Sequence, residues 1–205
     1  FTKINKNKIH FLPIPVDPSI ESGEFYNTDK STDLFFALSN GVNFGKLKKN
    51  SYDERIKFVN NLLKINNNLS FNILGLYNHQ PKWNFQFLDE LKFSKTALNL
   101  SRGGPNKYST SNRLATLAGN GSAVLIDANV GYQDFFSDKE MFFYKNEKHL
   151  MNNLEKICYD KNVYKAMGRN LKKRYFEIFN NRIIADYIIF INFNERIFKS
   201  YIWNK

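Results

Sequence analysis

The residues with the clearest chemical potential lie in one polar loop, residues 101–113, which leads into an expected helix at residues 112–118. The loop combines hydroxyls, paired glycines and three cations: Ser101, Arg102, Gly103, Gly104, Lys107, Tyr108, Ser109, Thr110, Ser111, Asn112 and Arg113. Backbone N–H groups at a helix start, with the positive end of its dipole, form an anion site that hydroxyls and an arginine can complete. The pattern therefore predicts a phosphate or diphosphate ligand. The alternative is that Ser111 or Asn112 only caps the helix within a solvated loop.

Two further loops follow expected strands and belong to the same candidate site. Ser39, Asn40 and Gly41 come after the first strand, and Tyr77 comes after the second. In an open parallel sheet the ligand crevice lies outside the carboxyl ends of the strands, so we expect these loops to meet there. Tyr77 and Tyr108 are candidates for stacking on a nucleobase. The chain has neither the glycine spacing of a dinucleotide-binding fingerprint nor a Gly-Lys-Ser/Thr phosphate loop, which disfavours NAD binding and ATP hydrolysis.

Disulfide and metal chemistry have little support in the sequence. The single Cys158 excludes an intramolecular disulfide and a cysteine-based zinc site, and His10, His79 and His149 form no i, i+4 pair. A buried Cys158 on an apolar helix face, in a reducing compartment, is the simplest expectation. The longest apolar run near either end, residues 183–193, is about half a bilayer span. We therefore expect no membrane helix and a cytoplasmic location.

The elements that must position these loops alternate along the chain. Apolar runs predict strands at residues 33–38, 70–76, 96–100, 123–126 and 141–144. Helical spacing predicts one helix after a capping box formed by Ser51 and Glu54, and others at residues 87–93, 112–118, 149–159, 163–178 and 183–201. Pro13 and Pro15 predict an extended segment over residues 9–17. The alternation indicates an α/β fold: a Rossmann-like parallel sheet with helices on both faces and a helical C-terminal segment.

The 205-residue chain is basic, with 30 Lys+Arg against 19 Asp+Glu and a net charge of +11. The excess is greatest near the C-terminus, where residues 151–205 hold 11 cations and 5 carboxylates. Nucleic-acid binders more often show a continuous basic stripe with interleaved aromatics, so a nucleic-acid partner is disfavoured and stays an alternative. We expect Lys172, Lys173 and Arg174 to form a solvated helix face. Peripheral contact of this cluster with an anionic membrane surface is the alternative.

Four short motifs follow one another along the chain: residues 94–102, Ser111-Asn112-Arg113, residues 117–125 and residues 132–136. Their order resembles the C-terminal half of a GT-B glycosyltransferase, of the group-1-like set that includes spore-maturation CgeB-type proteins. Residues 12–17 resemble the segment that joins the two GT-B domains, and residues 52–55 resemble the start of the first helix of that half. The resemblance covers about residues 9–180 and depends on the order of motifs that are weak individually.

The resemblance implies a domain that binds the nucleotide diphosphate of a sugar donor, while a separate N-terminal domain holds the acceptor. Residues 1–20 would be the interdomain linker, residues 21–180 the donor-binding domain, and residues 181–205 a C-terminal helix that packs back toward the preceding domain. Neither a metal nor another cofactor is expected, because basic side chains and a helix N-terminus neutralise the leaving diphosphate. The implied activity is transfer of a hexose to an acceptor, whether glycan, lipid or protein, that the sequence does not identify.

The resemblance assigns stabilisation of the leaving diphosphate to Arg113, with the Ser109 and Ser111 hydroxyls beside it and Arg102 as a further candidate. The other expected donor contacts are Ser39, Asn40, Gly41, Tyr77, Tyr108, Asn112 and Thr116. Thr116 departs from the family, whose members commonly place a glutamate three residues after the arginine, where it can accept hydrogen bonds from ribose hydroxyls. A threonine accepts without charge assistance. A non-catalytic nucleotide-sugar-binding or scaffold module is therefore an alternative function.

Overall fold

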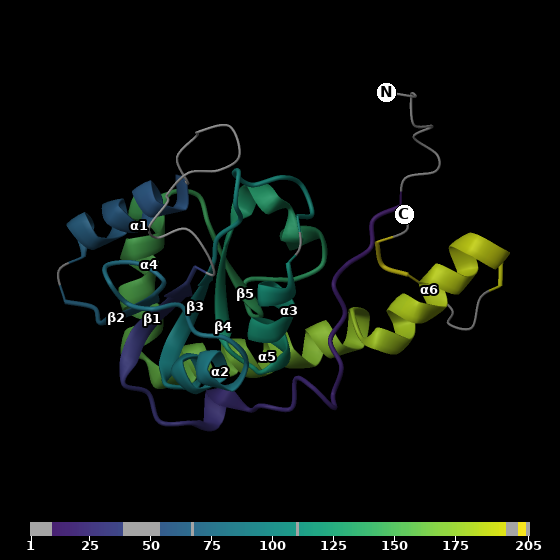
Figure 1. The fold of residues 1–205 in the computed structure, drawn as a ribbon, viewed down its shortest axis with the longest axis horizontal. Helices are drawn as coiled ribbons and strands as arrows, with labels where there is room; N and C mark the ends of the chain where they lie inside the picture. The colour runs from purple at the N-terminus through teal and green to yellow at the C-terminus, as the bar shows by residue number, and fades with distance from the viewer. Residues whose placement is uncertain (1–9, 39–53, 67, 110, 196–200, 204–205) are drawn as a thin grey trace.

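The computed structural model describes residues 10–38, 54–66, 68–109, 111–195 and 201–203. Within these residues one sheet holds its strands in the order β2-β1-β3-β4-β5 (Figure 1). The strands are β1 (Thr32–Ala37), β2 (Phe71–Leu74), β3 (Ser94–Asn99), β4 (Ala123–Asp127) and β5 (Met141–Tyr144). Each neighbouring pair runs parallel. The predicted parallel sheet is therefore confirmed.

The strands are buried on both faces, which explains their continuous apolar runs. Leu34, Phe35 and Phe36 of β1 are each 1% exposed, and Val124 and Ile126 of β4 have no exposed surface. Because successive side chains point to opposite faces of a strand, Phe35 enters one core while Leu34 and Phe36 enter the other. A parallel sheet of this kind must be covered by helices on both sides.

Helices cover both faces of the sheet (Figure 1). Helices α1 (Glu54–Ile65) and α4 (Glu147–Tyr159) pack on one face, and α2 (Asn84–Lys92) and α3 (Asn112–Gly119) pack on the other. Helix α5 (Lys161–Ile178) contributes Met167 to the core beneath α1 and α4, and Leu171 to the core beneath α2 and α3. Short 3-10 helices lie in the connections: η2 (Phe25–Asn27), η3 (Ala128–Val130) and η4 (Tyr132–Asp134). These helices confirm the predicted two-sided covering, although Ser51 of the expected capping box lies outside the described residues.

The last helix is shorter than its apolar pattern predicts. Helix α6 (Asn181–Phe193) ends where Asn194 adopts a left-handed conformation with a φ of 58°. Asparagine tolerates this conformation better than most residues, so it commonly ends helices. The prediction of a helix as far as Tyr201 is therefore wrong. Instead, Tyr201 packs back onto Tyr187 of α6, with ring centroids 4.8 Å apart.

The segment before η2 runs beside the junction of α5 and α6 and does not join the sheet. Val16 forms an isolated parallel bridge with Asn180. The N–H of Val16 donates to the carbonyl of Phe179, and the N–H of Asn181 donates to the carbonyl of Val16, both over 3.0 Å. Figure 1 shows that α6 and the chain before Val16 both extend away from the sheet. In its described part, residues 10–17, the predicted extended segment thus forms one bridge.

The basic cluster on α5 is not the solvated face that its sequence predicts. The Lys172 ammonium donates to the backbone carbonyls of Glu21 and Gly23, over 3.3 and 2.7 Å. Arg174 donates to a backbone carbonyl over 3.4 Å, whereas Lys173 is exposed. The prediction fails because Lys172 and Arg174 fasten neighbouring segments to α5. Two of the three charges therefore serve packing within the domain.

Candidate functional site

The sheet has a topological switch point between β1 and β3. These strands are neighbours, but the chain leaves β1 toward β2 on one side and leaves β3 toward β4 on the other. Connections that diverge in this way leave a crevice outside the carboxyl ends of the two strands, where open parallel sheets bind ligands. A cavity of about 840 Å³ lies here, lined by Ala37 and Leu38 at the end of β1 and by Leu100 and Ser101 after β3.

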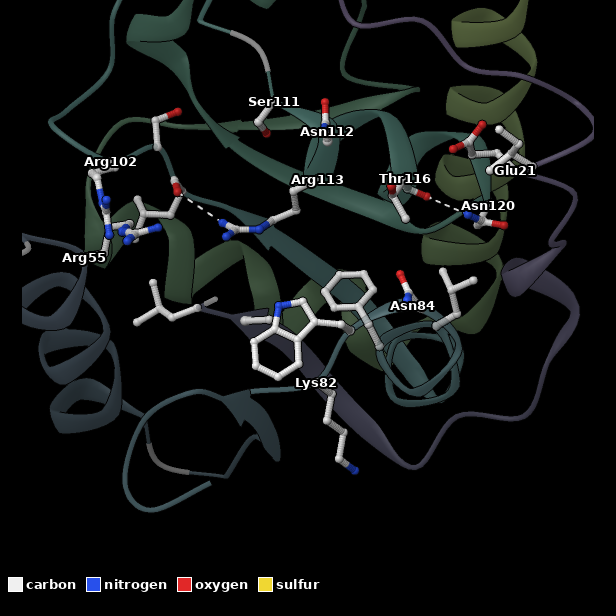
Figure 2. A pocket seen from close by; sticks show the side chains of 18 of the residues that line it. Glu21, Arg55, Lys82, Asn84, Arg102, Ser111, Asn112, Arg113, Thr116 and Asn120 are labelled. Atoms are coloured by element: carbon white, nitrogen blue, oxygen red, sulfur yellow. Dashed lines mark hydrogen bonds between the residues drawn. The ribbon is translucent and has the colours of Figure 1, made fainter. Parts of the chain in front are cut away.

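Arg113 of α3 lines this cavity near its centre (Figure 2). Its Nη1 donates to the carbonyl of Leu100 over 3.3 Å, and its Cζ lies 5.7 Å from the centroid of the Phe36 ring. Leu100 follows β3 and Phe36 belongs to β1. The guanidinium is therefore held by both strands that flank the switch point, and a positive charge is fixed at the crevice.

Helix α3 begins at the cavity wall. Ser111 is its N-cap, and the Ser111 hydroxyl accepts the N–H of Leu114 over 3.2 Å. The capping role considered for Ser111 is thus confirmed, but it does not exclude a ligand. The first N–H groups of a helix have no intrahelical carbonyl partner, and Asn112 and Arg113 line the cavity together with Ser111. The cap and the anion site are therefore compatible.

The structure brings six of the predicted residues to this one cavity: Arg102, Ser109, Ser111, Asn112, Arg113 and Thr116. Figure 2 shows Arg102 on one side of Arg113 and Thr116 on the other. Thr116 comes three residues after Arg113, so both side chains lie on the same side of α3. The predicted loop and its helix form one surface, while the ligand contacts of each residue stay a prediction.

The two tyrosines considered for base stacking do not line the cavity. Tyr77 is 47% exposed beyond the edge strand β2, and its hydroxyl donates to the Asn60 side chain. Tyr108 packs against Phe135, with ring centroids 5.0 Å apart, and its hydroxyl donates to Asp134. Neither ring therefore forms part of the cavity wall, although Tyr108 directly precedes Ser109, which does. The remaining predicted contacts, Ser39, Asn40 and Gly41, lie outside the described residues.

Several cavity residues were not predicted as ligand contacts, because most of them come from segments without a recognisable motif, and the motifs that contain Arg55 and Asn120 assigned them no role. They are Ile20 and Glu21 before η2, Arg55 in α1, Lys82 and Trp83 before α2, Asn84, Phe87 and Leu88 in α2, and Asn120 after α3. Arg55 is 7% exposed, and a buried guanidinium requires hydrogen-bonding partners or an anion. Its spacing with Val59 and Leu62 (i, i+4, i+7) places Arg55 on the buried face of α1. This spacing is the pattern from which a buried arginine could have been predicted.

One part of the cavity wall is aromatic. Trp83 immediately precedes α2 and is 56% exposed, whereas Phe87, one turn along, packs edge to face against Phe35 of β1 with centroids 5.2 Å apart. Asn84, the first residue of α2, has a φ of 49°, a left-handed conformation that costs energy for a residue other than glycine. Trp83 thus presents a large accessible ring at a cavity of ligand size, and such a ring suits a planar group.

The charged side chains of the cavity are mainly cationic. Among the residues that the structure describes, Arg55, Lys82, Arg102 and Arg113 line it together with one carboxylate, that of Glu21, and the Lys82 ammonium is paired with the Glu90 carboxylate. Within the same residues, no three His, Cys, Asp or Glu side chains lie close enough together to hold a metal ion. The cation set suits an anionic ligand such as a phosphate. As for membrane insertion, no helix in the described part of the chain is both long and apolar enough to cross a bilayer.

The opposite end of the sheet carries an ion pair and Cys158. The Lys95 ammonium lies 2.7 Å from the Asp33 carboxylate, which also accepts hydrogen bonds from the N–H and hydroxyl of Ser70. Burial acts to raise the pKa of Asp33, but the hydrogen bonds from Lys95 and Ser70 outweigh it and hold this pKa below its usual value. Cys158 is 4% exposed, and burial raises the pKa of its thiol to about 12. The predicted buried Cys158 is confirmed.

Two of the solved structures with a similar fold illustrate the likeness. The crystal structure of TarM superposes with a TM-score of 0.56 at 10% sequence identity, over 90% of this chain and 38% of TarM. A sucrose-phosphate synthase from Thermosynechococcus elongatus superposes with a TM-score of 0.50 at 14% identity, over 86% of this chain and 48% of the synthase. At these identities the likeness shows the fold alone. The two coverages also show that this chain spans less than half the length of either protein.

Sequence comparison identifies the family. No curated protein matches the chain. A family model described as glycosyl transferase-like matches residues 55–189, which is more than half of the 205 residues. The match includes the polar loop, α3 with Arg113, and the strands and helices that follow as far as α6. The chain therefore belongs to the glycosyl transferase-like family, as its resemblance to group-1-like glycosyltransferases predicted.

Proposed function

We propose that the cavity binds the diphosphate of a nucleotide-sugar donor, and that the chain is the donor-binding half of a metal-independent, GT-B-type glycosyltransferase. The observation that carries this proposal is the position of Arg113. Its guanidinium is held by the Leu100 carbonyl and the Phe36 ring at the switch point, beside the N-terminus of α3. A fixed cation and a helix dipole at one wall form a site for a doubly charged phosphate group.

In transfer, the bond between the sugar and the diphosphate breaks, and negative charge develops on the leaving oxygen. Arg113 and the first N–H groups of α3 offer preorganised positive charge where this happens, which lowers the barrier without any reorganisation. The Ser111 hydroxyl accepts the Leu114 N–H and so keeps its own proton for a phosphate oxygen. Arg55 and Arg102 add positive charge to the lining of the same cavity, whereas the Lys82 ammonium is paired with Glu90.

The nucleobase is best placed on Trp83. The ring is 56% exposed at the cavity wall, and Phe87 on the following turn is anchored against Phe35 of β1. A nucleobase presents a planar π face, which stacks on an aromatic ring whatever the base. This assignment replaces the stacking role considered for Tyr77 and Tyr108, neither of which reaches the cavity.

The acceptor, whether glycan, lipid or protein, is best held by a further domain. This part of the proposal is supported by coverage, since the chain spans 38% of TarM and 48% of the synthase. It is also supported by the way in which α6 and the chain before Val16 extend away from the sheet. Residues 1–20 would then link the two domains, residues 21–180 would bind donor, and residues 181–205 would return toward the other domain.

A second candidate function is a non-catalytic nucleotide-sugar-binding module. Thr116 favours it, because this uncharged acceptor stands on α3 where related enzymes commonly have a glutamate. The two functions separate when the full-length protein, with its acceptor-binding domain, is incubated with donor and released nucleoside diphosphate is measured. Release by hydrolysis or transfer indicates an enzyme, whereas stable binding without release indicates the module.

The donor-binding proposal is tested by calorimetry with UDP, GDP and their hexose conjugates. We expect at least one of them to bind with a dissociation constant below about 1 mM, because Arg113 stands beside the N-terminus of α3 and Arg55 and Arg102 line the same cavity. Circular dichroism of the same sample verifies that the chain is folded. If the folded chain binds none of these compounds at millimolar concentration, the proposal is wrong.

A further inference from the structure

The two ends of the cavity differ in chemistry. Arg55 and Arg102 lie on one side of Arg113, and Glu21, Thr116 and Asn120 lie on the other (Figure 2). The first side suits phosphate oxygens. The second side offers a carboxylate, a hydroxyl and an amide, which are the groups that hydrogen-bond neutral hydroxyls. A ligand that fits both sides carries its negative charge at one end and hydroxyls at the other.

Glu21 comes from outside the matched family region, on the segment before η2, and the segment is firmly held. Lys172 donates to the carbonyls of Glu21 and Gly23, over 3.3 and 2.7 Å. The N–H of Gly23 donates to Oδ1 of Asn120 over 2.9 Å, and the Asn120 amide donates to the carbonyl of Thr116 over 2.9 Å. The segment is thus fastened to α5 and to the end of α3, which fixes Glu21 relative to the cavity.

The stem of Glu21 lies directly on the last turn of α3, and Gly119 permits this approach. A Cβ at Gly119 would stand 2.5 Å from the Cβ and 2.6 Å from the Cγ of Glu21, distances that real side chains do not reach. Thr116 precedes Gly119 by three residues on the same helix, and Thr116 and Glu21 line the same side of the cavity (Figure 2). Carboxylates near a helix C-terminus are electrostatically disfavoured, so helix stability does not explain this placement.

The carboxylate has one oxygen engaged. Oε2 accepts the N–H of Asp17 over 2.8 Å, which closes the turn that places Glu21. None of the described residues donates a hydrogen bond to Oε1. A carboxylate oriented by a single backbone bond can accept two further hydrogen bonds, and charge assistance makes them strong. Two hydroxyls on neighbouring carbon atoms can both donate hydrogen bonds to one carboxylate, so a vicinal diol suits this acceptor.

We infer that Glu21 binds a vicinal diol of the ligand, with the diphosphate held at Arg113. This inference rests on the proposed function. The diol belongs either to the ribose of the nucleoside or to the transferred hexose, since each ring is attached to the diphosphate. Glu21 thus supplies to the cavity a charged hydroxyl acceptor that α3 itself does not carry.

The experiment compares the intact chain with Glu21→Gln, because glutamine keeps the shape and can still accept the Asp17 N–H. Ligands are UDP, 2′,3′-dideoxy-UDP, UDP-glucose and inorganic diphosphate, titrated calorimetrically. We expect Glu21→Gln to weaken UDP or UDP-glucose by about tenfold or more, as loss of charge-assisted bonds requires, and to leave inorganic diphosphate unchanged. Weakening of UDP that is absent for the dideoxy compound identifies ribose. Weakening confined to UDP-glucose identifies the hexose.

A matched control is Glu24→Gln, which removes the same charge from the same segment at an exposed position outside the cavity. It should leave every affinity unchanged, and thermal denaturation should show both variants folded. If UDP and UDP-glucose bind Glu21→Gln as tightly as the intact chain, the Glu21 inference is wrong while the donor site stands. If no compound binds the intact folded chain, the donor site and the inference both fail.

Discussion

The guanidinium of Arg113 lies over the ring of Phe36, with its Cζ 5.7 Å from the ring centroid. One residue belongs to α3, which follows the polar loop, and the other belongs to β1. Their contact, with the Leu100 hydrogen bond, joins the two strands of the switch point to the start of α3. These contacts hold the guanidinium in one position at the cavity. A cation that is already in place can bind a diphosphate with little reorganisation.

Removal of the Arg113 side chain should weaken diphosphate binding. For Arg113→Ala we expect a loss of at least about 1.5 kcal/mol in the binding free energy of UDP or GDP, the scale of a charge-assisted hydrogen bond. Calorimetry measures it, and Lys173→Ala is the control because Lys173 is an exposed cation that does not line the cavity. An affinity that is equal in Arg113→Ala and the intact chain would remove Arg113 from the site.

Trp83 should contribute to nucleotide binding but not to binding of inorganic diphosphate. Base–aromatic stacking is worth about 1–3 kcal/mol, so Trp83→Ala should weaken UDP by that amount and Trp83→Phe by less. The neighbouring Phe85→Ala is the control, because Phe85 is 82% exposed and does not line the cavity. Equal losses in Trp83→Ala and Phe85→Ala, or a loss with inorganic diphosphate, would argue against a base platform at Trp83.

Cys158 should be unreactive in the folded chain. Burial raises the pKa of its thiol to about 12 from 9.0, so the thiolate fraction near pH 8 falls about a thousandfold. Iodoacetamide at pH 8 should therefore leave the native chain unmodified and alkylate it fully in guanidinium chloride, as mass spectrometry would show. Rapid labelling of the native chain would show that Cys158 is accessible and that its helix opens readily.

The ion pair of Asp33 and Lys95 should make stability depend on acidity. Hydrogen bonds hold the pKa of Asp33 below its usual value of 3.8 in the folded state, although burial opposes them. The folded state therefore binds the proton less readily than the unfolded state, and the stabilisation is present above about pH 4 and lost as the pH falls through the lowered pKa. The difference in stability between the intact chain and Asp33→Asn, measured by urea unfolding, should be greatest near pH 7 and should shrink as the pH falls below about 4. A constant difference across this range would contradict the linkage.

The sheet was predictable because its signals are local. Strands β1 and β4 each contain an unbroken apolar run, at residues 34–37 and 123–126, and a strand buried on both faces needs little else to be recognised. The polar loop and Arg113 were found for the same reason, since hydroxyls, glycines and cations stand together just before α3. Local composition was therefore sufficient for the fold class and for one wall of the cavity.

The rest of the cavity depends on contacts between distant segments. Glu21 reaches the cavity only because Asn120 and Lys172 hold its segment, and no local pattern reports that. Tyr108 was expected to contact the ligand but has a φ of 56°, a left-handed turn conformation, and its ring rests on Phe135. Composition identifies which groups are present, whereas such turns decide where they point.

The bridge between Val16 and Asn180 has a consequence for how the chain reaches its native state. It joins residues 164 positions apart, so it encloses the whole sheet within one loop whose ends meet. The entropy cost of closing a loop grows only with the logarithm of its length. Contacts between residues so far apart nevertheless tend to form late, and the contacts within the sheet do not depend on this bridge. We expect the core between β1 and α5 to assemble first, and the segment that carries Glu21 to dock onto it afterwards.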